Sequence, residues 1–299
     1  MTSHGSFVAF LDRLGGEVLH KSVSKRLAAT ATAALLVSVC GSSYSAAHEL
    51  PVGDGHVASR PAKGYVYACR MHFRGGGAYA TGAWFHGRTW NPNQKPHVQG
   101  NVTWPSARLS VTTSGDSLHI RGNGLPVKQA TGRFPISPTD PAFRYDRNPN
   151  SIQARSVDLD LPVHPVRARS PGCLPMGMIG VTVTGVAIYS AVDDGGRDAA
   201  AHEIQDRCDG HPERTGRYHY HSASPCLPGA RNNRLVGWAL DGYPIFGMRD
   251  KRGKTLTNSD LDACHGRAET VKVGRLTYDY AYRLTAEYPY TIGCFVGRR

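Results

Sequence analysis

The sequence has no apolar run long enough to cross a membrane. Its longest run, residues 27–40, has 14 residues, whereas a spanning helix needs about 20. Residues 21–26 before it carry three basic side chains, and residues 45–47 after it are small. This order is the layout of a secretory signal peptide. We expect cleavage after Ala47, no membrane span in the mature form, and a secreted or periplasmic protein; a retained amino-terminal anchor is the alternative.

The sequence also lacks clustered positive charge. The net charge is +12, but the arginines are scattered singly, and no nucleic-acid-binding fold is recognisable. Nucleic-acid binding needs a basic stripe on such a fold, so we expect no nucleic-acid partner. The charge is compatible with an anionic envelope polymer as partner, although a solvated basic surface is the simpler interpretation; a glycan is the other class of partner that we consider.

No sequence motif names a catalytic nucleophile. Residues 115–118 spell Gly-Asp-Ser-Leu, as in a lipase-like nucleophile block, but no suitable Asp-x-x-His follows near the carboxyl end. The flanking residues have turn chemistry between two alternating segments. We therefore predict a hairpin turn at this position.

Few segments have the periodicity of a helix. Only residues 198–207 fit one, opened by Asp198 at an N-cap position. The remainder divides into short β-branched and aromatic runs between 34 glycines and 19 prolines, the pattern of strands and turns. The expected strands lie at residues 65–70, 101–113, 117–122, 151–161, 179–189, 217–221, 235–247 and 276–295. We predict a mainly β fold, an antiparallel sandwich or barrel-like sheets with one short helix and long Gly/Pro-rich loops.

A proline-rich segment, residues 134–149, divides the chain. We expect residues 1–47 to be the signal peptide and an amino-terminal extension. Residues 48–150 would then form a leading β-rich region. Residues 151–299 carry the motifs, and we expect them to pack with the leading region as one domain.

The most informative motif alternates tyrosine and histidine at residues 218–221. Other blocks surround it in order: Asp-x-Cys-x-Gly-His at 206–211, Asp-Gly-Tyr-Pro-Ile-Phe-Gly at 241–247, Tyr-Pro-Tyr at 288–290 and Gly-Cys-Phe at 293–295. This ensemble resembles the YHYH protein family of exported bacterial proteins, over roughly residues 160–299. The family has no settled activity, so the resemblance implies kinship without a particular function.

Two segments of the chain repeat the same pattern. Asp206-x-Cys208-x-Gly210 recurs as Asp262-x-Cys264-x-Gly266, and residues 218–222 have a weaker counterpart from residue 280. Each copy ends in a cysteine. This suggests two related halves, of which only the first carries the histidine pair.

Cleavage after Ala47 would leave six of the seven cysteines, an even number that indicates disulfides in an exported protein. Six cysteines allow 15 pairings. The repeat favours Cys208 with Cys226 and Cys264 with Cys294, which leaves Cys69 for Cys173.

His219 and His221 are the principal candidate site residues. Residues two apart in a strand point to the same face, so the two imidazoles should lie side by side and can share one ion. Imidazole suits zinc, copper, iron or nickel, and copper or zinc is the cofactor that we expect. The further candidate ligands are His211, His202 and Asp206, the last two four apart on the predicted helix; His265 is weaker.

Three other interpretations remain open. The alternating residues can form a structural rib of satisfied hydrogen bonds. The histidine pair can act as general acid and base in a hydrolase-like enzyme, oriented by Asp241 or Asp206. A glycan-binding module would use tryptophans as stacking platforms, and the candidates are Trp84, Trp90, Trp104 and Trp238. The Asp193-Asp194-Gly-Gly segment resembles a calcium loop only in part and fits a turn with a helix cap.

Overall fold

The computed structural model describes residues 49–73, 75 and 79–299. The described residues belong to one compact unit. The expected signal peptide, its cleavage site and the mature terminus at His48 lie outside the described residues, and a boundary at residue 150 stays a prediction. Within the described part, no helix has the length and apolar character that a membrane span requires.

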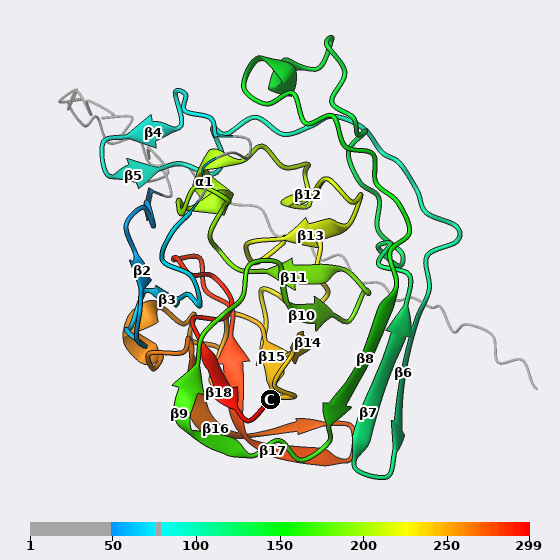
Figure 1. The fold of residues 1–299 in the computed structure, drawn as a ribbon, viewed down its shortest axis with the longest axis vertical. Helices are drawn as coiled ribbons and strands as arrows, with labels where there is room; N and C mark the ends of the chain where they lie inside the picture. Colours follow the sequence, from blue (N-terminus) through cyan, green and yellow to red (C-terminus); the bar gives the residue numbers. More distant parts are fainter. Residues whose placement is uncertain (1–48, 74, 76–78) are drawn as a thin grey trace, which may run out of the picture. The chain divides into compact units, whose positions relative to one another are not determined.

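A mixed sheet of eight strands runs through the centre of this unit (Figure 1). Its order is β12-β13-β11-β10-β14-β15-β17-β16. In chain order, the first four strands of this sheet are β10 (Met178–Thr182), β11 (Ala187–Tyr189), β12 (Gly210–Pro212) and β13 (Tyr218–Tyr220). The other four are β14 (Leu235–Ala239), β15 (Pro244–Phe246), β16 (Gly266–Val273) and β17 (Leu276–Arg283). The mainly β fold is confirmed. In the described residues this sheet stays open, with no closed barrel, and it includes two parallel pairs of strands.

The central sheet consists of two equivalent halves. In the first half β11 pairs with β13 in parallel, and Ile188 lies opposite Tyr220. In the second half β15 pairs with β17 in parallel, and Ile245 lies opposite Tyr282. The outer strands match as well, because β12–β13 and β16–β17 are both antiparallel. The short sequence repeat therefore marks a duplication of a four-stranded unit.

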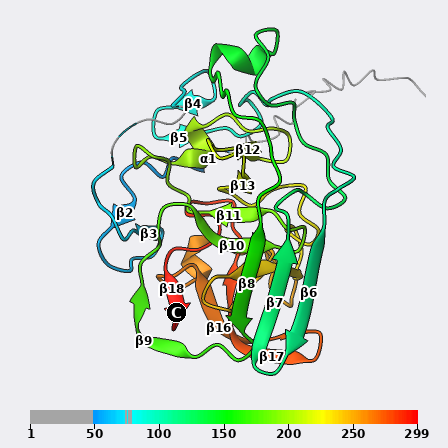
Figure 2. The same ribbon diagram turned by 45° about the vertical axis from the view of Figure 1, so that its right-hand side comes forward.

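The two halves meet where β10 and β14 pair in antiparallel fashion, with Val181 opposite Trp238. A second sheet, β6 (Leu109–Ser114), β7 (Ser117–Gly122) and β8 (Val157–Pro162), packs against this junction. Figure 2 shows these three strands beside the central sheet. Leu118, Ile120 and Val157 meet Val181 and Trp238 in one buried cluster. This face-to-face packing is the sandwich-like part of the fold.

The β6–β7 hairpin has the predicted turn, because Ser114 pairs with Ser117 across Gly115 and Asp116. On β8, Val157 and Leu161 are buried whereas Asp158 and Asp160 are exposed. The alternation in the sequence therefore predicted correctly which face of this strand is buried.

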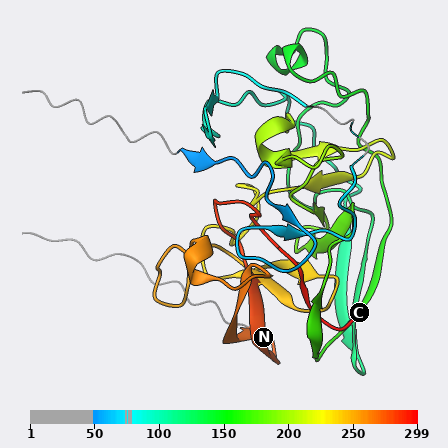
Figure 3. The ribbon, with the colours of Figure 1, turned by 60° about the vertical axis from the view of Figure 1, so that its left-hand side comes forward.

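Short strands and loops complete the unit. The strand pairs are β1 (Leu50–Pro51) with β5 (Thr89–Trp90), β5 with β4 (Phe85–His86), β2 (Val57–Ala58) with β3 (Val66–Tyr67), and β9 (Arg167–Gly172) with β18 (Phe295–Gly297). Two 3-10 turns are η1 (Pro141–Arg144) and η2 (Asn258–Asp260). Figure 3 shows β2 and β3 (blue) beside the carboxyl-terminal segment (red), where the Tyr67 N–H donates to the Gly293 carbonyl.

Three disulfides link the described cysteines. They join Cys69 to Cys173, Cys208 to Cys226 and Cys264 to Cys294, which are the pairs expected from the sequence. The last two occupy corresponding places in the two halves. The first ties the leading region to the segment that precedes β10.

The predicted helix at residues 198–207 is much shorter in the structure. Only α1 (Ala199–His202) is helical, and Asp198 caps it through the Ala201 N–H. The chain becomes extended at Glu203 because its backbone carbonyls accept hydrogen bonds from outside the helix. Lys95 Nζ donates to the carbonyls of Ala200 and Glu203, and the chain then pairs with residue 98 through Asp206. The inference that His202 and Asp206 share a helical face is therefore wrong.

Candidate metal centre

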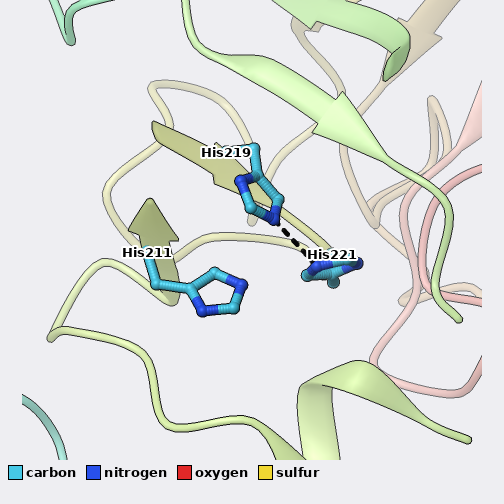
Figure 4. Close-up of side chains that lie close together, drawn as sticks. All are labelled: His211, His219 and His221. Carbon is cyan, nitrogen blue, oxygen red and sulfur yellow. Dashed lines mark hydrogen bonds between the residues drawn. The ribbon is translucent and has the colours of Figure 1, made fainter. Parts of the chain in front are cut away.

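His219 and His221 lie side by side, as the period of a strand predicts. Their Nε2 atoms are 3.0 Å apart (Figure 4). Tyr218 and Tyr220 point to the opposite, buried face, where the Tyr218 hydroxyl donates to Asp206 and the Tyr220 hydroxyl to Gln129. All four side chains of the tetrapeptide are buried. The alternation in the sequence therefore separates a tyrosine face from a histidine face.

The outer nitrogen of each imidazole is fixed by a backbone carbonyl. His219 Nδ1 lies 3.1 Å from the Arg217 oxygen, and His221 Nδ1 lies 2.5 Å from the Ser190 oxygen. A carbonyl oxygen only accepts hydrogen bonds, so each Nδ1 carries the hydrogen and each neutral ring presents a lone pair at Nε2. Two lone pairs therefore face each other across 3.0 Å. Two such lone pairs could hold a metal ion between them.

His211 joins the pair from the neighbouring strand. It lies directly opposite His219 in the β12–β13 ladder. One ligand nitrogen from each of the three rings lies within 4.8 Å of the other two. Figure 4 shows one His211 nitrogen facing the other two rings and the second facing away. Neither His211 nitrogen has a hydrogen-bond partner, although the side chain is buried.

Glu203 adds a carboxylate that the sequence analysis missed. Its Oε2 lies 3.3 Å from His211 Nε2 and 3.2 Å from His221 Nε2, and the side chain is 9 % exposed. These are ion-pair distances, but Oε2 forms no hydrogen bond of good geometry. Glu203 reaches the histidines because α1 ends at His202, so the residue after the helix turns towards β12 and β13. In the sequence analysis, the adjacent His202 was considered instead. A predicted helix that ended at His202 would have made Glu203 a candidate ligand.

The charges of these groups depend on one another. Burial raises the pKa of Glu203, but His211 and His221 lower it more strongly, to about 2. Burial lowers the pKa of His211, but the carboxylates of Glu203 and Asp146 together raise it above its usual value. The pKa of His219 lies well below its usual value because of burial and the neighbouring imidazoles, and burial also lowers that of His221. A proton shared between His219 and His221 is therefore unfavourable.

The other predicted site residues lie in different surroundings. His202 uses both ring nitrogens, with the Ala80 carbonyl at 3.0 Å and Asp54 at 2.8 Å. Asp206 accepts the N–H groups of Gly132 and Cys208 as well as the Tyr218 hydroxyl. Both residues are thus fully engaged away from the three histidines.

Asp241 and His265 belong to the second half of the sheet. Asp241 accepts the Tyr282 hydroxyl and the Gly297 N–H, and His265 contacts Thr285. The structure therefore brings His211 to the predicted pair, adds Glu203, and leaves His202, Asp206, Asp241 and His265 elsewhere.

A cavity of about 1110 Å³ opens beside the cluster. His211, His219, His221 and Glu203 all line it, as do four aromatic side chains, Phe73, Tyr79, Tyr145 and Tyr189. Ligand sites usually measure about 300–1,000 Å³, so this space exceeds what an ion alone requires. The cluster is accessible to a small molecule or a segment of a polymer.

The second half of the sheet has different side chains at the positions equivalent to the three histidines. When the two strand pairs are aligned by their register, Arg267 is equivalent to His211, Ala281 to His219 and Arg283 to His221. Arg283 is fully buried, and its Nε donates to Glu269 at 2.6 Å. The second half thus contains a permanent cation with its own carboxylate, where the first half has three imidazoles around Glu203.

Two alternatives from the sequence find little support in the described geometry. Trp84, Trp90 and Trp238 are buried, and the half-buried Trp104 donates to Thr131. Stacking platforms for a glycan would have to come from other residues.

The Asp193 segment forms the expected turn. The Asp193 carboxylate accepts the Gly195 and Arg197 N–H groups, and Asp198 caps α1. The carboxylates of Asp193 and Asp198 are therefore both engaged by backbone N–H groups.

Comparison with known proteins identifies the region that holds the cluster. Residues 158–255 match the family model described as YHYH protein. No curated protein and no solved structure matches the chain. The match contains β10–β15, with the alternating tetrapeptide, Glu203 and His211. Over this region, about a third of the chain, the sequence is similar to the YHYH protein family.

Proposed function

We propose that the protein binds a divalent transition metal ion through Nε2 of His211, His219 and His221, with Glu203 as the fourth ligand. The observation that carries this proposal is the pair of Nε2 lone pairs 3.0 Å apart on rings whose Nδ1 atoms are held by carbonyls. Zinc–nitrogen bonds measure about 2.0–2.1 Å, so two nitrogens on one ion lie roughly 3–3.5 Å apart. The Nε2 atoms of His219 and His221 already have this spacing.

The donor set supports zinc or copper as the ion. Imidazole suits zinc, copper, iron and nickel, and soft metals such as Cu(I) prefer thiolate or thioether ligands. The described cluster offers three imidazoles and a carboxylate. A carboxylate also offsets the charge of a divalent ion inside a buried site.

The structural rib is the less favoured interpretation. A rib would stabilise the fold by pairing every buried ring nitrogen. His219 and His221 satisfy one nitrogen each in this way, but neither nitrogen of His211 has a partner. Glu203 Oε2 is also unpartnered by hydrogen bonds. Of these unpartnered atoms, an ion would coordinate Nε2 of His211 and Oε2 of Glu203.

A metal titration of protein purified without a histidine tag tests the proposal. Zinc and copper are each titrated in competition with a chromophoric chelator. We expect stoichiometric binding by the wild type and its loss in the His219→Ala/His221→Ala variant. The matched control is His86→Ala/His119→Ala, which removes two more exposed histidines and should bind like the wild type. Equal binding by all three proteins would contradict the proposal.

A second candidate function is metal-assisted hydrolysis at the same centre, which the adjoining cavity favours. Zinc lowers the pKa of a bound water to about 7 in catalytic sites, and the cavity of about 1110 Å³ admits a substrate to the cluster. A panel of chromogenic esters tests this candidate with zinc-loaded and metal-free protein. Hydrolysis that needs zinc and disappears in His219→Ala/His221→Ala supports it; equal rates with and without zinc argue against it.

We also propose that the protein is exported and works in a secreted or periplasmic setting. The order of basic, apolar and small residues before position 48 supports this. Three disulfides fit an oxidising compartment. Sequencing the amino terminus of the exported protein should give His48, and an uncleaved chain retained in the membrane fraction would contradict export as proposed.

A further inference from the structure

The three histidines differ in how their outer nitrogens are held. His219 and His221 each have Nδ1 against a backbone carbonyl. Metal-binding histidines usually donate this second N–H to a carbonyl or a carboxylate, which fixes the ring and its tautomer. His211 Nε2 faces Glu203, so its Nδ1 lies on the other side of the ring. That Nδ1 is buried without a partner.

Asp146 is a buried carboxylate with one oxygen that accepts no hydrogen bond. It lines the same cavity as His211, and the residue is 5 % exposed. Its Oδ1 accepts the Asn148 N–H at 2.8 Å, whereas Oδ2 has no hydrogen-bond partner. An unpaired carboxylate oxygen in a buried setting is costly. Asp146 therefore has an acceptor to offer, and His211 has a donor.

The segment that carries Asp146 is docked on the strand that carries His211. The Asn148 side-chain amide donates to the carbonyl of Pro212 at 2.9 Å, and Pro212 directly follows His211.

We propose that Asp146 becomes the outer partner of His211 when the ion binds: the two side chains share no hydrogen bond in the structure, and Oδ2 then accepts the His211 Nδ1–H and holds Nε2 towards the ion. This inference rests on the proposed metal-binding function. Asp146 is a positioning residue, because it acts through His211 and does not itself contact the metal. The centre then has three imidazoles, each fixed from behind by one oxygen: Arg217 O, Ser190 O and Asp146 Oδ2.

The substitution Asp146→Asn isolates this contact. An asparagine keeps the size of the side chain, and its Oδ1 can still accept the Asn148 N–H. Its Nδ2 replaces the free oxygen, however, so that a donor faces the His211 N–H. The matched control is Asp116→Asn in the exposed β6–β7 turn, outside the cavity.

Two measurements with zinc alone as the probe test the proposal. In competition titrations, Asp146→Asn should bind zinc about 10–100-fold more weakly than the wild type, and Asp116→Asn should bind equally well. In ¹H–¹⁵N NMR of the zinc-bound wild type, His211 should coordinate through Nε2 and show a downfield, slowly exchanging Nδ1–H. This signal should move upfield or vanish in Asp146→Asn. A residue that only supports the fold would change the unfolding temperature without moving that resonance.

The outcomes separate this inference from the metal proposal. Coordination of zinc through His211 Nδ1 in the wild type would overturn the inference without any variant. Unchanged affinity and an unchanged His211 signal in Asp146→Asn would overturn it as well, while metal binding would stand. A wild type that binds no zinc would defeat both proposals.

Discussion

His221 and Arg283 occupy equivalent positions in the two halves of the central sheet. His221 Nδ1 lies 2.5 Å from the Ser190 carbonyl, and Arg283 Nη1 lies 3.5 Å from the Gly247 carbonyl. The two acceptors also correspond, since Ser190 directly follows β11 and Gly247 directly follows β15. We propose that the duplicated unit keeps one buried position for a positively charged group. In the second half the chain supplies that group; in the first half we propose that a metal ion does.

The ion pair of the second half should contribute strongly to stability. Glu269→Ala would leave the buried guanidinium of Arg283 without its carboxylate, and breaking such a pair typically costs about 3–5 kcal/mol. The control is Glu213→Ala, the corresponding carboxylate of the first half, which accepts hydrogen bonds from the N–H groups of Thr215 and Arg217 and from the Thr215 hydroxyl. It should cost about 1 kcal/mol. Denaturant unfolding of both variants measures the difference, and equal losses would argue against the equivalence drawn above.

The two equivalent disulfides should separate stability from metal binding. Replacing Cys208 and Cys226 by alanine, or Cys264 and Cys294, should cost about 2–4 kcal/mol in each case. Only the first pair lies next to the segment that carries His211, because Cys208 precedes β12 by two residues. Zinc affinity should therefore fall in the first double variant and stay near the wild-type value in the second. An equal effect of both on zinc affinity would show that the halves are not independent.

Acid should weaken metal binding mainly through His211. Its pKa is raised above 6.5, whereas those of His219 and His221 are lowered. A proton must leave His211 before its Nε2 can coordinate an ion. Zinc affinity should thus begin to fall already as the pH drops through the raised pKa of His211, with release of a single proton. Calorimetry in buffers of different ionisation enthalpy counts the protons; release of two or three near pH 6.5 would contradict this assignment.

The same shifts predict how the metal-free protein responds to pH. The raised pKa of His211 stabilises the fold below about 6.5, and this contribution is lost as the pH rises through the folded-state value. The lowered pKa of Glu203 stabilises the fold above about 4.5, and this contribution is lost as the pH falls towards about 2. The destabilisation by Glu203→Gln should therefore be largest between these two values. Urea unfolding across this range checks it, and a pH-independent difference would contradict it.

The fold could be predicted where side chains alternate or glycine marks a turn. Residues 117–122 were predicted as a strand and match β7, because Leu118 and Ile120 form its buried face. β16 was missed, since Arg267, Glu269 and Lys272 interrupt its apolar character and it lies at the edge of the sheet. The duplication left only a short sequence signal, because the backbone contacts that preserve it do not depend on particular side chains.

The site could be predicted only as far as one strand extends. The spacing of His219 and His221 is enough to place them on one face, and the structure bears this out. Their neighbours depend on tertiary contacts. Glu203 joins them because Lys95 takes up the carbonyls that a longer helix would have used. A contact between residues 108 positions apart leaves no local pattern in the sequence.

Anomalous diffraction from crystals grown with zinc tests the central claim most directly. Data collected on both sides of the zinc absorption edge locate the ion without reference to the protein atoms. We predict one strong peak among the three imidazoles, about 2.0–2.2 Å from each Nε2 and from a Glu203 oxygen. An empty cluster in zinc-soaked crystals, with Nε2 of His219 and His221 still in contact, would contradict the account.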